Sequence, residues 1–511
     1  MFSKKFTLFF LTVLILGLLT ACGAAQPETI TIVETVEVEK VVEKEVEVVV
    51  TKEVEKIVEK EVEVVKEVEK IVEVEKEGAT EEVTIVARCK ASPPYEEGRC
   101  NNLLSAVGAA NAELAAAGDK RRIALEVIQD DADWGPYKTE FELASDAGEA
   151  PDIVCSGHEH VGDWATAGFI RDLTDDLGKY PEFDDVIDSL WTSTELNGQR
   201  WGVPQDAEAR PLYYSKPLLR ELGWSDDDIE SLDERIAAGE YTFQDMLDTA
   251  AEAVEKGIVE PGDGWWHRPA NGPDFLYYYY GAGGEVTDPA GSNALVFDTA
   301  AAQKVYAMLY DAAQTRNIIR PNKLDADWDF HKEYTSSFEN VVFVFEGTWR
   351  WSSWHTNYLQ DVGGESYLFE NVGFAPIPAN EEGTGEPITL THPLIYMISS
   401  QSENPDLALL LISKATVKEL NTDYAIASGH LGVLKSQADY PTYKTARFLS
   451  ETLPLLEYTT FLPNSPYWSA YSEAYFLGIQ AVESGDLTPE EAIEVVTEQL
   501  QNELGDNVII Q

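Results

Sequence analysis

Short apolar runs alternate with longer stretches of helical periodicity along most of the chain. Val83–Ala87, Ile123–Ile128 and Pro151–Val154 have the length and apolar content of buried strands. Between the first two lies an alanine-rich stretch, Leu103–Ala117, whose pattern predicts a helix. Strands and helices that alternate in this way predict a parallel sheet with helices on both faces.

The helical pattern continues to the end of the chain. Four stretches begin with Thr, Asp or Pro near their first residue, as helices commonly do. They are Thr242–Gly257, Thr299–Gln314, Asn404–Ala415 and Thr488–Leu504. We therefore predict an α/β fold from the first strand onward.

Ligands of such sheets bind at the loops beyond the carboxyl ends of the strands. The predicted strands place Cys89–Cys100, Gln129–Tyr137 and Cys155–Asp163 in these loops. Trp134 lies in the second loop, where it would either wall a ligand cleft or pack structurally.

A different pattern precedes the first strand. Residues 28–77 are almost entirely Val, Ile, Glu and Lys, and VEKIVE at Val54–Glu59 recurs at Val68–Glu73. Apolar residues spaced by seven favour a coiled coil, whereas the period-two alternation and the β-branched content favour strands. In either conformation, residues 22–82 would form a stalk.

The first 21 residues have the organisation of an export signal, in which Lys4 and Lys5 precede an apolar run shorter than a spanning helix. Leu19-Thr20-Ala21-Cys22 resembles the lipobox of bacterial lipoproteins, in which the cysteine is lipidated and becomes the mature N-terminus. The resemblance implies a lipid anchor on Cys22, on the periplasmic or cell-surface side of a membrane. A plain secretory signal is the alternative, and both imply export.

Charge excludes one class of partner. The 511 residues include 91 Asp and Glu against 37 Lys and Arg, a formal net charge of -54. Such acidity removes the sequence-independent attraction to phosphate backbones, so we do not expect a nucleic acid partner.

Three cysteines follow Cys22. Cys89 and Cys100 flank a Pro-containing loop and are the expected disulfide, whereas Cys155 ends an apolar strand and is expected to be a buried thiol.

Common enzyme and cofactor signatures are missing. The sequence has no Walker-type loop, no GxGxxG after a strand, no HExxH and no GxSxG. We therefore expect no cofactor and no catalysis. His and carboxylate side chains, such as those of His158, Glu159 and His160, can bind zinc. Beyond this short segment, however, no further ligand follows at a recognisable spacing. A polar loop or a ligand-binding loop is expected there instead of a metal site.

Several segments, in sequence order, resemble the maltose-binding group of the extracellular solute-binding proteins that serve ABC-type importers. Pro151–Leu173 resembles, without a gap, the family's PDI strand and polar loop, and Asn197–Lys216 resembles its Val-Pro and Leu-Tyr-Tyr-Asn-Lys pattern. Phe345–Trp354 is similar to its Gly-x-Trp-x-Trp turn. The resemblance implies two α/β lobes with a ligand cleft between them, and a membrane permease as partner.

The resemblance also divides the chain. The first lobe would comprise residues 83–207 and about 376–450, and the second would comprise 208–375 and about 451–511. The chain would therefore cross between the lobes several times.

Carried over position by position, the resemblance assigns ligand contacts to Glu159, His160, Glu208 and Trp349. His160 stands where the maltose binders carry Arg, so maltose itself is not expected.

Further contacts are expected toward the C-terminal half. The family places one near Asp274. Its aromatic pair falls on Ser472 and Glu473 in this chain, so stacking there must come from Trp468 or Tyr471.

The residues themselves also point to a sugar. A sugar ring presents C–H faces and hydroxyl edges, so its site needs flat aromatic rings together with ionised acceptors. Trp349, Glu159 and Glu208 supply both. Their carboxylates would disfavour anionic ligands unless Arg210 or His160 reverses the local sign.

We therefore expect an oligosaccharide or glycoside as the ligand. A polyamine, a peptide or a metal complex in the same fold is the first alternative. A secreted glycosidase that uses Glu159 and Glu208 as its acid and base is the second.

Overall fold

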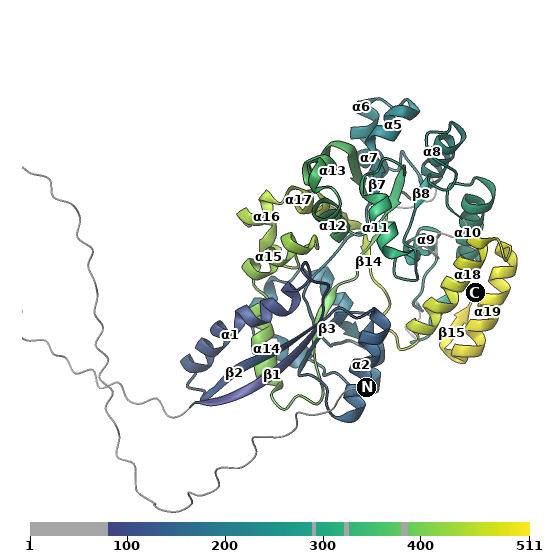
Figure 1. Cartoon of the computed structure of the whole chain (residues 1–511). Coiled ribbons are helices and arrows are strands. Elements are labelled where there is room, and N and C mark those ends of the chain that lie inside the picture. Colours follow the sequence, from purple (N-terminus) through teal and green to yellow (C-terminus); the bar gives the residue numbers. More distant parts are fainter. Residues whose placement is uncertain (1–79, 289–292, 321–326, 380–386) are drawn as a thin grey trace, which may run out of the picture. The chain divides into compact units, whose positions relative to one another are not determined.

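The computed structural model describes residues 80–288, 293–320, 327–379 and 387–511; the predicted export signal, Cys22 and all but the last residues of the predicted stalk lie outside these ranges. Glu77–Gln511 forms one compact unit. This unit contains a five-stranded and a four-stranded sheet, each flanked by helices (Figure 1). The α/β prediction is confirmed.

The five-stranded sheet has the order β2-β1-β3-β13-β6. β1 pairs in parallel with β2 and β3, whereas β13 runs antiparallel to both of its neighbours. Its strands are β1 Glu81–Lys90, β2 Arg121–Asp130, β3 Ile153–Gly157, β6 Val203–Pro204 and β13 Leu394–Ile398. The three strands predicted from the sequence are therefore the parallel part, and β13 joins them from far along the chain.

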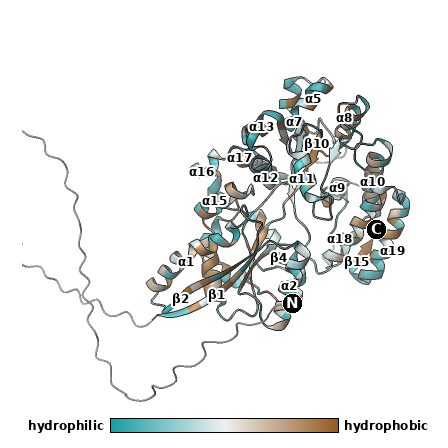
Figure 2. Cartoon of the chain, viewed as in Figure 1, coloured by the Kyte–Doolittle hydropathy of each residue, from teal (hydrophilic) through white to brown (hydrophobic). Residues whose placement is uncertain are grey.

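Side chains of β3 alternate between two hydrophobic cores, as the period of two in a strand requires. Ile153 and Cys155 pack in the core that includes α1 (Gly98–Ala116) and α14 (Pro405–Ala415). Val154 packs in the core formed with α2 (Trp134–Ala147) and α3 (His160–Ala167). Apolar strands and polar outer helix faces are visible in Figure 2.

β1 begins two residues before the predicted strand. Glu81 and Glu82 pair in register with Arg121 and Arg122 of β2. Opposite charges on directly paired residues stabilise a sheet, which explains why the strand extends beyond its apolar run.

A disulfide joins Cys89, in β1, to Cys100, in the first turns of α1. Cys155 is a buried free thiol in β3. The bond ties the end of β1 to the start of α1, on the side of the sheet where its strands end.

The four-stranded sheet has the order β11-β7-β10-β8. Its strands are β7 Leu212–Ser215, β8 Trp265–Trp266, β10 Phe343–Phe345 and β11 Val372–Ala375. One face packs on α8 Phe243–Glu255, α9 Phe275–Gly281, α10 Thr299–Tyr310, α18 Trp468–Ser484 and α19 Pro489–Leu504. The other face packs near α12 Trp349–Asn357 and α13 Glu365–Asn371. Of the five helices predicted from sequence, Leu103–Ala117 corresponds to α1, and the other four correspond to α8, α10, α14 and α19.

Shorter elements complete the unit. The remaining helices are α4 Thr174–Leu177, α5 Lys216–Leu222, α6 Asp226–Glu230, α7 Leu232–Ala237, α11 Trp328–Ser336, α15 Lys418–Ser428, α16 Pro441–Thr445 and α17 Arg447–Thr452. The remaining strands pair as β4 Glu195–Leu196 with β5 Gln199–Arg200, β9 Leu295–Phe297 with β15 Val508–Ile510, and β12 Thr389–Leu390 with β14 Thr459–Thr460.

Stretches of chain that cross between the two sheets lie side by side. The first crossing runs from β6 to β7, and the second runs from β11 through β12 to β13. The Thr389 and Thr391 hydroxyls of the second accept hydrogen bonds from the backbone N–H groups of Arg210 and Glu208 in the first, at 2.8 and 3.1 Å. β14 then pairs with β12 before the chain continues to α18. Side chains carried by the crossings are thereby brought together.

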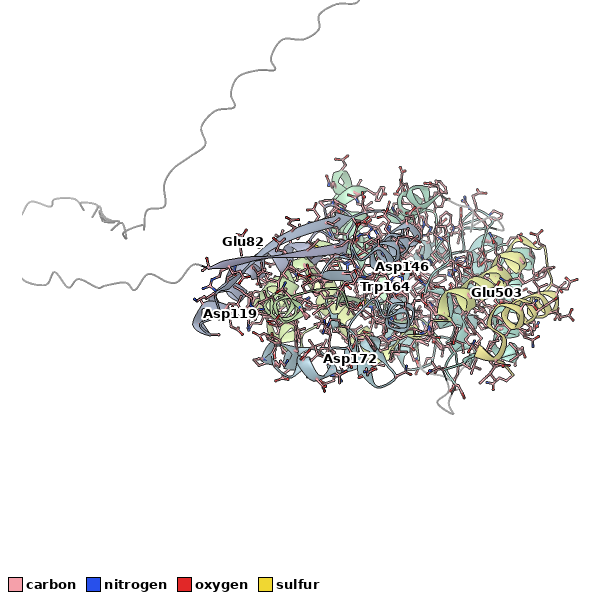
Figure 3. The ribbon with its side chains drawn as sticks, turned by 90° about the horizontal axis from the view of Figure 1, so that it is seen from below. Glu82, Asp119, Asp146, Trp164, Asp172 and Glu503 are labelled. Atoms are coloured by element: carbon pink, nitrogen blue, oxygen red, sulfur yellow. A yellow bond between two sulfur atoms is a disulfide. The ribbon has the colours of Figure 1, made fainter. Side chains whose placement is uncertain are left out.

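The acidic excess is carried largely on the surface. Asp146, Asp172 and Glu503 are exposed, whereas Trp164 is buried; all four are labelled in Figure 3. Within the described residues, no helix is both long and apolar enough to cross a membrane.

The start of α3 packs closely against the segment that precedes α18. A Cβ added at Gly162 would lie 2.4 Å from the carbonyl carbon of Ser465. We predict that Gly162→Ala lowers the free energy of unfolding by about 1–3 kcal/mol, because the two backbones must separate to admit a methyl group. Urea unfolding measures this change.

Gly135→Ala in α2 is the matched control, since a Cβ there meets no atom within 4 Å. Alanine should be tolerated or should stabilise that helix by up to about 1 kcal/mol. Equal stability of the two variants would contradict the close approach at Gly162.

Candidate functional site

Charged and aromatic side chains from both sheets meet at the crossings. Glu208 and Arg210 come from the first crossing and His392 comes from the second. Glu159 comes from the loop after β3, and Trp349 begins α12. We call the following set the crossing cluster: Glu159, Glu208, Arg210, Asp274, Trp349, His392 and His430.

Arg210 joins most of the cluster. Its guanidinium group lies 2.6 Å from Glu208 Oε1 and 2.9 Å from Asp274 Oδ1, and it donates to the Leu390 carbonyl at 2.9 Å. Only 2% of the residue is exposed. A charge buried this deeply requires such partners, because its water has been removed. Arg210 also lies over the Trp349 ring, 5.2 Å from the centroid, a distance at which cation–π attraction acts.

Burial has a different effect on the two carboxyl groups that Arg210 contacts. It raises the pKa of Glu208 above its ordinary value, outweighing the attraction of Arg210. Burial acts in the same direction on Asp274, but Arg210 and Arg268 outweigh it and lower the pKa of that carboxyl group. Asp274 is therefore the firmly ionised partner.

His392 lies between two carboxylates. Its Nε2 is 2.5 Å from Glu159 Oε2, and its Nδ1 is 3.9 Å from Glu208 Oε1. Burial disfavours the charged imidazole, but Glu159 and then Glu208 raise the pKa of His392 above its usual value. Burial would raise the pKa of Glu159, yet His392 and His160 hold it well below the usual range. Each partner thus favours the charged form of the other.

Glycine makes room for this pair. A Cβ at Gly157, the last residue of β3, would lie 2.3 Å from Glu159 Oε2 and 2.7 Å from His392 Nε2. The end of the strand must therefore lack a side chain for Glu159 to reach His392.

Trp349 is supported on its own loop and by a histidine. A Cβ at Gly347 would overlap the indole, 1.6 Å from its Cζ3 atom. The indole and the His430 ring are nearly parallel, with centroids 5.8 Å apart, and His430 Nε2 lies 3.9 Å from Glu208 Oε2. Trp349 is half-buried, so its position is fixed while part of its surface stays accessible.

Trp134 and His160 extend the cluster toward the five-stranded sheet. The Trp134 ring centroid lies 6.0 Å from that of His392 and 6.1 Å from that of His160, and 41% of Trp134 is exposed. His160 Nδ1 is 2.8 Å from Ser156 Oγ. Burial lowers the pKa of His160 to about 4, so this ring is neutral at pH 7 and offers hydrogen bonds but no charge.

Two predicted contact residues lie elsewhere. Trp468 and Tyr471 stack on each other, 5.7 Å apart, in the core of the four-stranded sheet. Tyr471 is fully buried and donates to the Val296 carbonyl at 2.8 Å. They stand three residues apart on α18, so both face the same core. The structure does not bring them to the crossing cluster.

Neither His392 nor His430 was predicted as a contact residue. One weak signal was available, since the chain has only seven His. No group of three or more His, Cys, Asp or Glu within the described ranges is arranged to hold a metal ion.

The pair between His392 and Glu159 predicts a pH dependence of stability. The folded-state pKa of His392 is raised, so its contribution is fully present below the unfolded value of about 6.5 and is lost as pH rises through the folded value. We predict that His392→Gln lowers the free energy of unfolding by roughly 1–3 kcal/mol at pH 6, with a smaller loss at pH 9.

Denaturant unfolding of both proteins between pH 6 and 9 measures the difference. Burial lowers the pKa values of His158 and His160 to about 4. Their contributions to the pH dependence of stability are the same in the two proteins and largely cancel in the difference. A difference that stays constant with pH would contradict a charged His392.

Comparison with known proteins agrees with this architecture. Residues 121–420 match the family described as bacterial extracellular solute-binding protein. Maltose-bound MalE3 of T. maritima superposes with a TM-score of 0.64 at 19% identity, covering 82% of this chain and 100% of that one. The sugar-binding protein MalE of Xanthomonas citri gives 0.65 at 15% identity, covering 82% and 97%. The GacH receptor of Streptomyces glaucescens gives a TM-score of 0.62 at 19% identity, covering 82% of this chain and 97% of that one. The structure thus has the two-lobed fold of periplasmic binding proteins, and the chain belongs to the bacterial extracellular solute-binding protein family.

Proposed function

We propose that this protein captures a sugar, in the form of an oligosaccharide or glycoside, between its two lobes and delivers it to an ABC-type membrane permease. A lipid on Cys22 would hold it at the outer side of the membrane. One observation supports the proposal most: Trp349, Glu159 and Glu208 gather at the crossings with a shared set of partners. The structural neighbours named above include maltose-bound MalE3 and the sugar-binding protein MalE.

The chemistry of the cluster suits a polyol. A ring face packed on Trp349 and burying about 50 Å² of apolar surface would contribute about 1.3 kcal/mol. A hydroxyl donating to an ionised carboxylate contributes roughly 1.5–3 kcal/mol.

The alternatives fit less well. A polyamine would meet Arg210 and His392, which already neutralise the carboxylates it needs. A glycosidase needs a scissile bond between its two carboxyl groups. Here the His392 ring lies between Glu159 and Glu208. The bound solute would therefore leave unchanged.

Closure of the lobes supplies the signal to the permease in this proposal. We place one boundary at residues 207 and 208, within the first crossing, and another at about 375 and 376, where β11 ends. A ligand that contacts both Glu159 and Trp349 would favour the closed form, because it binds that form with more contacts.

Trp349→Ala and Glu208→Gln should each weaken sugar binding by about 1–3 kcal/mol, because the first removes the stacking surface and the second removes an acceptor charge. Isothermal titration calorimetry against a panel of mono- and oligosaccharides measures this loss. Trp224→Ala is the control, since Trp224 is also half-buried but packs on Tyr241, away from the cluster. No heat with any sugar would refute the proposed ligand, and native affinity in both variants would refute the proposed site.

A further inference from the structure

Within the described part of the chain, Lys90 is a cation near the crossing cluster whose Nζ atom has no ion pair. Lys90 is the last residue of β1 and is only 6% exposed. Among the described residues, no carboxylate lies within 4.0 Å of its Nζ, and no acceptor forms a hydrogen bond with it. Its location is fixed, because its carbonyl accepts from Arg99 Nη1 at 2.9 Å and the disulfide of Cys89 and Cys100 lies beside it.

The acids nearest to Lys90 are mostly engaged by arginines. Burial lowers the pKa of the Lys90 ammonium group, and Glu96, Asp130 and Asp131 oppose that shift. Glu96 pairs with Arg99 at 2.9 Å, and Asp130 accepts from Arg88 Nε at 2.9 Å. Asp131 is exposed to solvent, where water screens its charge.

Lys90 faces the accessible edge of the site. Its Nζ lies 5.4 Å from the centroid of the Trp134 ring. The same ring stands next to His392 and His160 and is 41% exposed. A ligand that covers the exposed surface of Trp134 would therefore come within reach of the Lys90 ammonium group.

The carboxylates of the crossing cluster do not repel an anion there. Each already has a cation: Glu159 has His392, Glu208 has Arg210, and Asp274 has Arg210 and Arg268. The expectation from sequence already named Arg210 as a residue that could reverse the local sign, and His392, which pairs with Glu159, adds a cation from a distant segment. The Lys90 Nζ atom is left without an ion pair of its own, and a largely buried charge is costly unless a partner is supplied.

We propose that Lys90, beside Trp134, binds a singly charged acidic group of the ligand, so that the transported solute is an acidic saccharide. The inference rests on the proposed function and specifies its substrate class. A uronate carboxylate and a sulfate ester share the required chemistry. A doubly charged phosphate ester would place a second, uncompensated negative charge near Asp131 and is disfavoured.

Matched ligands test the proposal. Oligogalacturonides and glucuronate-containing oligosaccharides can be titrated beside their methyl esters, which keep the sugar and linkage but lose the charge, and sulfated oligosaccharides form a third arm. We expect an acid form to bind roughly ten- to a hundredfold more tightly than its neutral counterpart, as for a hydrogen bond between charged groups. The arm that shows the preference distinguishes carboxylate from sulfate.

Lys90→Met should abolish this preference and leave the affinity for the neutral form within about twofold, because it keeps the apolar stem and removes the charge. Lys90→Gln keeps a hydrogen-bond donor but also removes the charge, so it should lose the preference for the acid form as well. It tests the same point if Lys90→Met fails to fold. Lys216→Met is the control: that lysine is also largely buried, but it pairs with Glu230 at 3.0 Å in the four-stranded half, and the preference should survive.

The outcomes separate the two proposals. If no saccharide binds in any form, the proposed function fails and this inference fails with it. If neutral saccharides bind and their acid forms bind no more tightly, the function stands and the acidic substrate class is overturned. A preference for the acid form that persists in both Lys90 variants would overturn the role of Lys90.

Discussion

The arrangement of the site depends on the buried guanidinium group of Arg210. It is almost fully removed from water, and three separate segments satisfy it: Glu208 in its own crossing, the Leu390 carbonyl in the second crossing, and Asp274 before α9. Only the first of these segments is close to Arg210 in the sequence. Because a buried charge without its partners would be strongly destabilising, this one residue fixes where the crossings stand and where Trp349 lies above them.

The charge distribution separates the surface from the site. The chain carries a net charge of -54, and exposed carboxylates such as Asp146 and Glu503 lie on its surface (Figure 3). At the crossings, by contrast, the buried acids Glu159, Glu208 and Asp274 pair with His392, Arg210 and Arg268. Net charge therefore describes how this protein behaves in solution, but it does not predict which ligand the site accepts.

The sequence predicted the fold well because its signals are local. Apolar runs marked β1, β2 and β3, and periodic stretches marked the long helices. The membership of the candidate site could be predicted only in part. Glu159 and Trp134 follow strand ends, and Glu208, Asp274 and Trp349 were reached through family resemblance. His392 and His430 were missed because only the paired crossings bring them near Glu159 and Trp349. Trp468 and Tyr471 carried the right residue types, but the face of α18 to which they belong is decided by packing.

A crystal structure of the protein with the solute that it retains through purification would test the central claim most directly. The account predicts electron density for a saccharide in contact with Trp349 and within hydrogen-bond distance of Glu159 or Glu208. A solute bound away from these three residues, or one that is not a saccharide, would contradict it.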